Sequence, residues 1–232
     1  WFIAQLTLMQ YYAPKIFQHY ATGIPNGPLW SVAVELQFYL LVPFLYRLLK
    51  SKSLAFKNVV IILMSIITFV FNHYQEYFME FNYRFQVVYF SVLNFFHFFG
   101  IGILIYLNFS ILKDAFVKNG KRLILLYTFF AILCAQRNIV LNTYEAESFT
   151  LVVNLLLALF VFSVAFLPIK KQGYFIQLND FSYGLYLYHV PIINVILTYG
   201  LVSHANAIFW AAAITFAIVS WYIIEKPFLK RK

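Results

Sequence analysis

The chain has 232 residues, of which 63% are hydrophobic and 11% are charged, and it carries a formal net charge of +9. An average soluble domain is about 45–50% apolar and about 25% charged, and one core of this size cannot bury so much apolar surface. The composition therefore excludes a soluble globular domain, a disordered chain and a disulfide scaffold. It predicts an all-α, polytopic integral membrane helical bundle in a lipid bilayer.

Seven apolar segments are each close to the roughly 20 residues that cross a bilayer. In chain order they cover residues 29–49, 57–72, 86–107, 122–138, 150–167, 182–199 and 206–225. Residues 1–12, WFIAQLTLMQYY, are typical of the outer end of another helix. We therefore expect seven complete transmembrane helices plus the end of an eighth, forming a single domain over residues 1–232 that lacks its N-terminal helices.

Charge in the connections alternates along the chain. Lys and Arg cluster after the first, third, fifth and seventh segments, and few bases follow the second, fourth and sixth. The positive-inside rule places the basic connections in the cytoplasm. We predict a multi-pass protein of the cytoplasmic (inner) membrane with a cytoplasmic C-terminus and with loop 13–28 outside. Division of the positive charge among these connections also argues against a nucleic-acid partner, and the basic stretch 108–121 is expected to be a solvated loop.

Glu35 lies in the first apolar segment, where an ionisable side chain at a helix centre costs roughly 2.5–3.5 kcal/mol. The preceding Asn-Gly-Pro at 26–28 is typical of a turn and a helix start. Ser31, Glu35 and Tyr39 are spaced i, i+4, i+8 and therefore share one helix face. Two interpretations of Glu35 are equally open from these residues. It either forms a structural hydrogen bond or ion pair between two helices, or it has a functional role.

Two histidines also lie in apolar segments. His189 is followed by Pro191, which frees a backbone carbonyl one turn earlier and favours a kink. This tyrosine-rich helix is suited to lining a cavity, and a neutral, hydrogen-bonded core histidine is the competing interpretation. His97 shares a face with Asn94, and Gly100 permits close helix approach, a pattern that favours packing and interhelical hydrogen bonding.

The remaining candidates indicate no further chemistry. The single Cys134 is predicted to be a small apolar packing residue. His19, His73 and His204 fall in predicted outer connections without metal-ligand spacing, and no nucleotide-binding or lipase motif occurs. We predict no metal site and no permanently bound cofactor, and we expect Pro227 to end the last helix.

Three motifs resemble the membrane acyltransferase-3 family. Residues 30–39, WSVAVELQFY, resemble its W-S-L-[SA]-V-E-E-Q-F-Y signature, and residues 181–191, FSYGLYLYHVP, are similar to its late I-S-Y-S-L-Y-L-W-H-x-P motif. Residues 225–228, EKPF, match its closing E-[KR]-P-F. The motifs occur in the family's order, and the resemblance covers essentially residues 20–232. The chain departs from the family at Leu36, where a second acid is frequent, and at Gly184, where serine is common.

The resemblance implies a ten-helix domain with both ends in the cytoplasm, in which segment 29–49 is the fourth helix. It implies a membrane-bound O-acyltransferase that moves an acyl group, expected to be acetyl, from acyl-CoA to a hydroxyl group. The implied acceptor is a cell-surface carbohydrate or glycoconjugate. The family's catalytic histidine lies on its first helix, so we expect it to be absent from residues 1–232.

Within this resemblance, Glu35 is expected to orient a histidine or bind acceptor hydroxyls, and His189 to bind the acceptor or the thioester carbonyl. The expected acceptor-binding residues are Trp30, Ser31, Gln37, Tyr39, Ser182 and Tyr186. A proton-coupled transporter or flippase of glycan precursors is the main alternative, because buried Glu35 and His189 also suit such a pathway. No inverted repeat supports that alternative. A seven-helix receptor ranks last because residues 1–12 resemble a helix remnant, and no oligomeric state is predicted.

Overall fold

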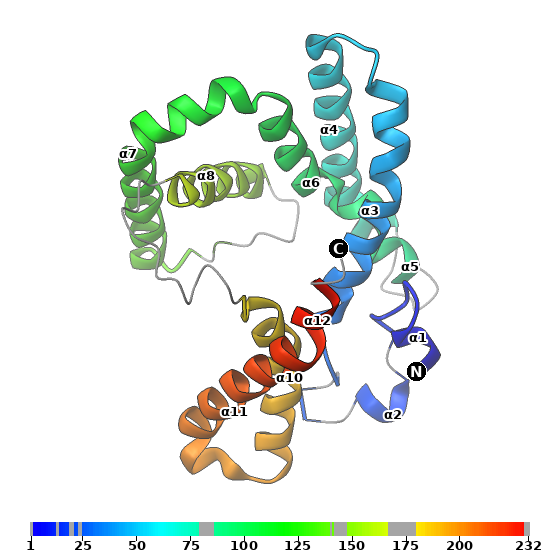
Figure 1. Cartoon of the computed structure of the whole chain (residues 1–232), viewed down its shortest axis with the longest axis vertical. Helices are drawn as coiled ribbons and strands as arrows, with labels where there is room; N and C mark the ends of the chain where they lie inside the picture. Colours follow the sequence, from blue (N-terminus) through cyan, green and yellow to red (C-terminus); the bar gives the residue numbers. More distant parts are fainter. Residues whose placement is uncertain are drawn as a thin grey trace. The chain divides into compact units, whose positions relative to one another are not determined.

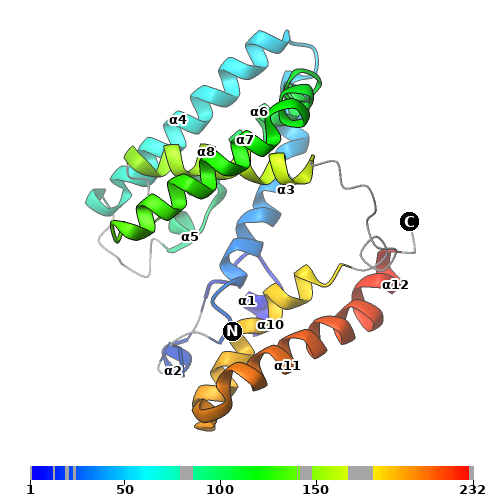
Figure 2. The same cartoon turned by 90° about the vertical axis from the view of Figure 1, so that its left-hand side faces the viewer.

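The computed structural model describes residues 2–12, 14–18, 21–22, 25–78, 86–139, 141, 148–166 and 180–229. Every regular element in these residues is a helix, which confirms the all-α fold (Figures 1 and 2). The chain forms two compact units: unit 1 comprises Trp1–Ala33 and Lys170–Lys232, and unit 2 comprises Val34–Ile169. Helix α3, Leu29–Leu49, contributes its first five residues to unit 1 and the remainder to unit 2.

Unit 2 is made of two packed helix pairs. Besides the larger part of α3 it contains α4 (Leu54–Phe78), α5 (Gln86–Tyr89), α6 (Val92–Leu107), α7 (Phe109–Gln136) and α8 (Ser148–Ala165). Helix α4 packs along α6, and α7 packs along α8. The close approach predicted at Gly100 is confirmed, because a Cβ at this position would collide with Ser65 Oγ of α4.

Unit 1 is built around a hairpin of two helices that lie side by side in both views (Figures 1 and 2). Its elements are α1 (Phe2–Gln5), α2 (Lys15–Gln18), α10 (Ser182–Thr198), η2 (Leu201–His204), α11 (Ala205–Ser220), η3 (Trp221–Glu225) and α12 (Lys226–Leu229). Gly184 lets α10 and α11 touch, since a Cβ there would lie 2.7 Å from Ala217 Cα. Gly200 then ends the α10 region with a φ of +66°, a left-handed conformation that suits glycine.

Four described helices are long and apolar enough to cross a membrane. They cover Leu29–Leu49, Leu54–Gln75, Val87–Leu107 and Leu201–Leu229, and Phe149–Ala165 is a shorter apolar helix. All seven predicted segments fall on helices, but seven complete spans are not confirmed. Helix α10 has only 17 residues, and the apolar part of α7 is flanked by Arg122 and Gln136.

The third predicted segment contains a break that its apolar pattern does not reveal. Phe90 and Ser91 separate α5 from α6. Ser91 Oγ donates to Val88 O at 2.6 Å, while Gln37 Nε2 donates to Phe90 O at 3.2 Å and Gln37 Oε1 accepts from Val92 N at 2.9 Å. Side chains thus bind backbone groups that helix ends leave unpaired.

The prediction of a solvated loop after this segment is wrong. Only Asn108 separates α6 from α7, and the basic residues that follow it are helical. Lysine is a good helix former. Gly120 lies against α8, since a Cβ at this position would lie 3.5 Å from Ser163 O. Asn108 exchanges two amide hydrogen bonds of 3.1 and 3.0 Å with Asn58 of α4, so the junction between α6 and α7 is fixed against α4.

The helix expected over residues 1–12 is limited to Phe2–Gln5. Thr7 Oγ donates to Ala4 O at 3.0 Å and accepts from Met9 N at 3.3 Å. These local side-chain bonds compete with continuation of the helix, so the prediction of a longer helix end is wrong.

The expectation that Pro227 ends the last helix is also wrong. After α11 the chain continues through the π-helical turn η3 into α12, which contains Pro227. A π turn bonds i to i+5, and proline is tolerated in the first turn of the helix that follows.

Several connections that carry the orientation argument lie outside the described residues. They include the side chains of Glu80, Arg84, Glu145, Glu147, Lys170 and Lys171, and His19 is also outside them. The inner-membrane location and the cytoplasmic C-terminus therefore stay predictions.

Candidate functional site

In unit 1 the loop before α3 is bound to α10 by side-chain hydrogen bonds between positions more than 150 residues apart in the chain. We call residue 22 and residues 25–31, together with residues 186–194, the loop–helix site. It contains the start of the 30–39 motif and most of the 181–191 motif. Two of the sequence motifs therefore meet in one place.

Asn194 is the most heavily bonded residue of the loop–helix site. Its side chain is 2% exposed. Asn194 Oδ1 accepts from Thr22 N at 3.1 Å and from Thr22 Oγ1 at 2.7 Å, and Asn194 Nδ2 donates to Pro25 O at 3.0 Å. Both ends of one amide therefore bind the loop, which fixes the loop against α10.

Pro191 creates a second attachment point. Proline has no N–H, so the carbonyl of Leu187 four residues earlier lacks its helical donor. Asn26 Nδ2 donates to Leu187 O at 3.0 Å. The freed carbonyl expected from the sequence is thus bound by the loop, and Asn26 bridges to α10 instead of capping α3.

Ser31 and Tyr186 form the third attachment. Tyr186 Oη donates to Pro28 O at 2.6 Å, and its oxygen lies 2.5 Å from Ser31 Oγ. Ser31 Oγ also lies 3.2 Å from Pro28 O. Two predicted acceptor-binding residues are therefore brought together as a pair of hydroxyls at the start of α3.

His189 lies one turn after Tyr186 on α10, with one ring nitrogen engaged. His189 Nδ1 is 2.7 Å from Tyr186 O, and the two rings are 5.9 Å apart. A carbonyl only accepts, so Nδ1 carries the proton, and in the neutral ring Nε2 is left as an acceptor. Within the described residues Nε2 has no hydrogen-bond partner, and the side chain is half-buried.

Two other predicted site residues are used elsewhere. Both ends of the Gln37 amide bind backbone groups at the α5–α6 break. Ser182 donates its backbone N–H and its hydroxyl to Asp180 Oδ1, at 3.0 and 2.6 Å. These two bonds hold the pKa of Asp180 below its ordinary value, and they give Ser182 a helix-start function.

Glu35 and Tyr39 are both exposed on α3. Among the described residues Glu35 makes no hydrogen bond or ion pair, so the interhelical bond considered from the sequence is not formed there. Tyr39 is 62% exposed, and Trp30 is half-buried in the first turn of α3. Because α3 is an unbroken helix, the predicted common face of Ser31, Glu35 and Tyr39 is present.

His97 lies in a buried polar layer between α4 and α6. It is 1% exposed, and Phe69 contacts it edge-on with ring centroids 5.5 Å apart. Among the described residues neither ring nitrogen makes a hydrogen bond to another helix. The interhelical bond here is made by Asn72, whose Nδ2 donates to Asn94 O at 3.2 Å, so His97 packs without supplying the bond expected from the sequence.

The described residues contain no group of three or more His, Cys, Asp or Glu side chains placed to hold a metal ion. Cys134 is buried and unpaired within α7. The loop–helix site itself is neutral and consists of hydroxyls, amides and one imidazole. Such a set suits hydrogen bonding to a polyhydroxylated molecule better than binding of an anion.

Sequence reasoning missed Asn194 and Thr22. A signal for Asn194 was present, since an amide in an otherwise apolar helix is costly without a partner. The carbonyl freed by Pro191 gave a second signal, because it required a donor from another segment. Nothing in the sequence identified Asn26 as that donor.

Comparison with known proteins adds to this geometry. A family model described as an acyltransferase domain (acyltransferase 3) matches residues 1–226. Nodulation protein 10 of Rhizobium leguminosarum bv. viciae is 27% identical over 224 residues, covering 91% of this chain and 57% of the relative. The chain thus spans a little over half the length of the curated relative it matches. No solved structure matches the chain.

Proposed function

Because the chain belongs to the membrane acyltransferase-3 family, we propose that it transfers an acyl group from acyl-CoA to a hydroxyl of a cell-surface carbohydrate or glycoconjugate. Acetyl is the proposed group and acetyl-CoA the donor. The hydroxyl oxygen forms an ester bond to the acyl carbon, the thioester C–S bond breaks, and CoA leaves as the thiol after taking up the hydroxyl's proton. The proposed location is the cytoplasmic membrane, with the C-terminus inside and the loop–helix site toward the outer side.

The observation that carries this proposal is the polarised imidazole of His189. Its Nδ1–H donates to Tyr186 O at 2.7 Å, which leaves Nε2 as an acceptor on α10, one turn after Tyr186. A sugar hydroxyl can donate to Nε2 while neighbouring hydroxyls bond to the serine and tyrosine oxygens. His189 thereby orients the acceptor hydroxyl.

Three residues of α3 are proposed to supply further acceptor contacts. Trp30 in the first turn of α3 offers an aromatic face on which a sugar ring can pack. Glu35, one turn after Ser31, is exposed and without a bonding partner among the described residues. Since an unpaired carboxylate in a span is costly, we assign it to bind acceptor hydroxyls or to orient the reacting histidine. Tyr39 continues the same face.

Gln37 and Ser182 receive positioning roles in this proposal. The Gln37 amide holds the α5–α6 break together, and Ser182 binds Asp180 at the start of α10. Substitution of either residue is expected to disturb the helices rather than to remove an acceptor contact.

The test uses variants made in the complete gene and assayed in membranes with radiolabelled acetyl-CoA. His189→Ala is expected to lower acyl transfer about 10- to 100-fold, because it removes one hydrogen bond to a hydroxyl that develops charge during the reaction. His204→Ala is the matched control, because His204 is exposed in η2 of the same unit. Equal transfer by both variants, at equal protein levels, contradicts the assignment of His189.

A parallel pair tests Glu35. Glu35→Ala is expected to abolish transfer while leaving membrane insertion intact, whereas Asp114→Ala on α7 leaves transfer unchanged. Asp114 is an exposed acid in unit 2 and serves as the control. Movement of a glycan precursor across vesicles without consumption of acyl-CoA would overturn the enzyme proposal in favour of a transporter.

A further inference from the structure

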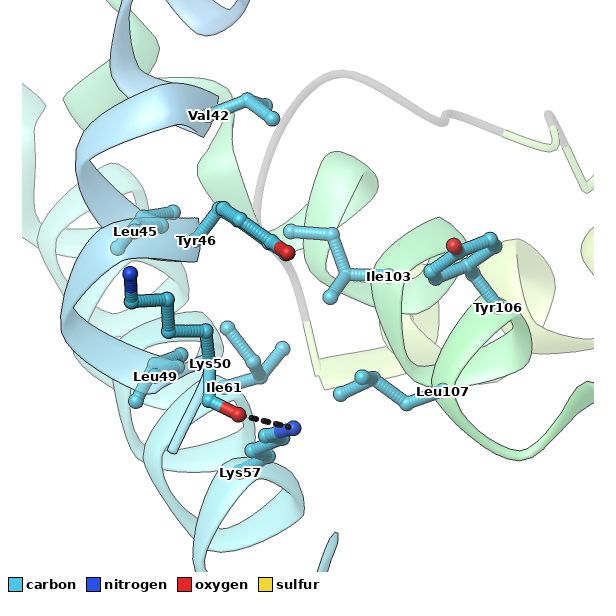
Figure 3. Close-up of a pocket in the computed structure, with 10 residues that line it drawn as sticks. All are labelled: Val42, Leu45, Tyr46, Leu49, Lys50, Lys57, Ile61, Ile103, Tyr106 and Leu107. Carbon is cyan, nitrogen blue, oxygen red and sulfur yellow. Dashed lines mark hydrogen bonds between the residues drawn. The ribbon is translucent and has the colours of Figure 1, made fainter. Parts of the chain in front are cut away.

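A cavity of about 400 Å³ lies in unit 2 between α3, α4 and α6 (Figure 3). Its wall is mainly aliphatic, with Val42 and Leu45 from α3 and Ile103 from α6 among the lining side chains. Tyr46 and Tyr106 supply the two hydroxyls of the wall. The cavity does not involve the loop–helix site, and the proposed reaction assigns it no role.

Two lysines form one end of this cavity. Lys50 follows the last residue of α3, and Lys57 lies in the first turn of α4. Lys57 Nζ donates to Lys50 O at 3.4 Å (Figure 3), so this ammonium binds a carbonyl at the C-terminal end of α3. No acidic residue lines the cavity, and neither lysine forms an ion pair within the described part of the chain.

Other side chains that line the cavity are exposed. Tyr46 is 69% exposed, Tyr106 is 79% exposed and Val42 is 37% exposed. On a helix that crosses the bilayer, side chains exposed in this way meet lipid chains. The cavity therefore joins a cationic end near the helix termini to an apolar slot along the helices, a polarity that matches a phosphate attached to a hydrocarbon chain.

We propose that this cavity binds an anionic phospholipid, with the phosphate between Lys50 and Lys57 and one acyl chain along the wall formed by α3 and α6. An acyl-CoA fits less well. Its pantetheine arm carries two amides that need hydrogen-bond partners when buried, and the wall offers only the hydroxyls of Tyr46 and Tyr106. A hydrocarbon chain needs none.

The experiment measures where a lipid lies, without using acyl transfer as its readout. Protein from the complete gene is placed in phosphatidylcholine nanodiscs that contain a little phosphatidylglycerol bearing a diazirine on one acyl chain. After illumination and digestion, mass spectrometry locates the adducts. We expect adducts concentrated on residues 42–49 and 103–107, and fewer adducts there from the same diazirine on phosphatidylcholine.

Charge and shape are tested by two matched pairs of variants. The double variant Lys50→Gln/Lys57→Gln is expected to weaken phosphatidylglycerol binding about 30-fold. Each lysine near the membrane surface adds to the free energy of binding an anionic lipid, and the two contributions together correspond to this factor. Lys52→Gln/Lys113→Gln removes the same charge away from the cavity and leaves the adducts in place. Ile103→Trp fills the slot and removes the adducts, whereas Leu93→Trp on the 61% exposed position of α6 does not.

Three results overturn the proposal. Equal labelling by phosphatidylglycerol and phosphatidylcholine means ordinary boundary lipid. Displacement of the phosphatidylglycerol adducts by acetyl-CoA means that the cavity belongs to the acyl donor. Absence of adducts on residues 42–49 and 103–107 from either lipid means that lipid does not occupy the slot.

Discussion

Replacement of Asn194 by alanine tests how the loop–helix site is held together. The change removes the three hydrogen bonds that join Asn194 to Thr22 and Pro25. Buried hydrogen bonds contribute about 0.6–1.5 kcal/mol each in this kind of setting, so the loop should lose about 2–4 kcal/mol of stability against local opening. That loss corresponds to opening about 30- to 1000-fold more often.

Hydrogen–deuterium exchange measures this opening directly, because the Thr22 amide is itself one of the donors to Asn194. Asn194→Ala should accelerate exchange in the peptide that contains Thr22 by the stated factor. Asn206→Ala is the control, since Asn206 is exposed on α11 of the same unit. Thr22→Val removes only the hydroxyl bond and should have a smaller effect, and the double variant with Asn194→Ala should exchange no faster than Asn194→Ala alone.

Exchange at Thr22 that is equal in Asn194→Ala and Asn206→Ala would show that Asn194 does not hold the loop. Fully additive effects of Thr22→Val and Asn194→Ala would show the same, because residues that act through one hydrogen-bonded contact are coupled. Either result would mean that the loop is held by contacts other than this amide.

Two further substitutions test the helices that frame the site. Gly184→Ala should destabilise unit 1 by about 1–3 kcal/mol in thermal denaturation, because the new methyl group meets Ala217 Cα at 2.7 Å. The higher helix propensity of alanine offsets part of this loss. Gly102→Ala is the control and should be neutral or slightly stabilising, because a Cβ at Gly102 has nothing within 4 Å. The pKa of Asp180 lies below its ordinary 3.8 because Ser182 donates hydrogen bonds to the carboxylate. The ionised carboxylate therefore stabilises the fold above about pH 4, and this stabilisation is lost as the pH falls through the folded-state pKa. Asp180→Asn should weaken this loss of stability at acid pH in a pH series of denaturation curves, and an unchanged loss would contradict the role given to the Ser182–Asp180 contact.

The sequence predicted the helices better than their ends and contacts. Apolar runs and their length identified α3, α4 and α6 because burial in lipid constrains composition strongly. The same reasoning failed over the start of α7, where lysines suggested a loop although lysine is a good helix former. It also failed at Phe90–Ser91, where the break depends on Gln37 from another helix.

The candidate site was predicted in part for a similar reason. Ser31, Tyr186 and His189 were identified by their motifs, and the structure brings these three together. Gln37 belonged to the same motif, yet its partners are backbone groups that no local pattern indicates. Asn194 and Thr22 lie outside the motifs, so only the tertiary arrangement reveals their contact.

Transfer of an acyl group to a glycan, the activity proposed for this protein, is tested most directly by one labelling measurement. Inverted membrane vesicles are supplied with acetyl-CoA labelled in the acetyl group, and the extracted glycan is examined for alkali-labile acetyl esters. We predict that labelled ester and free CoA appear together, that both require the intact gene, and that both fall with Glu35→Ala and His189→Ala. Labelled ester that is unchanged in membranes lacking the gene, or glycan movement without release of CoA, would contradict the proposed activity.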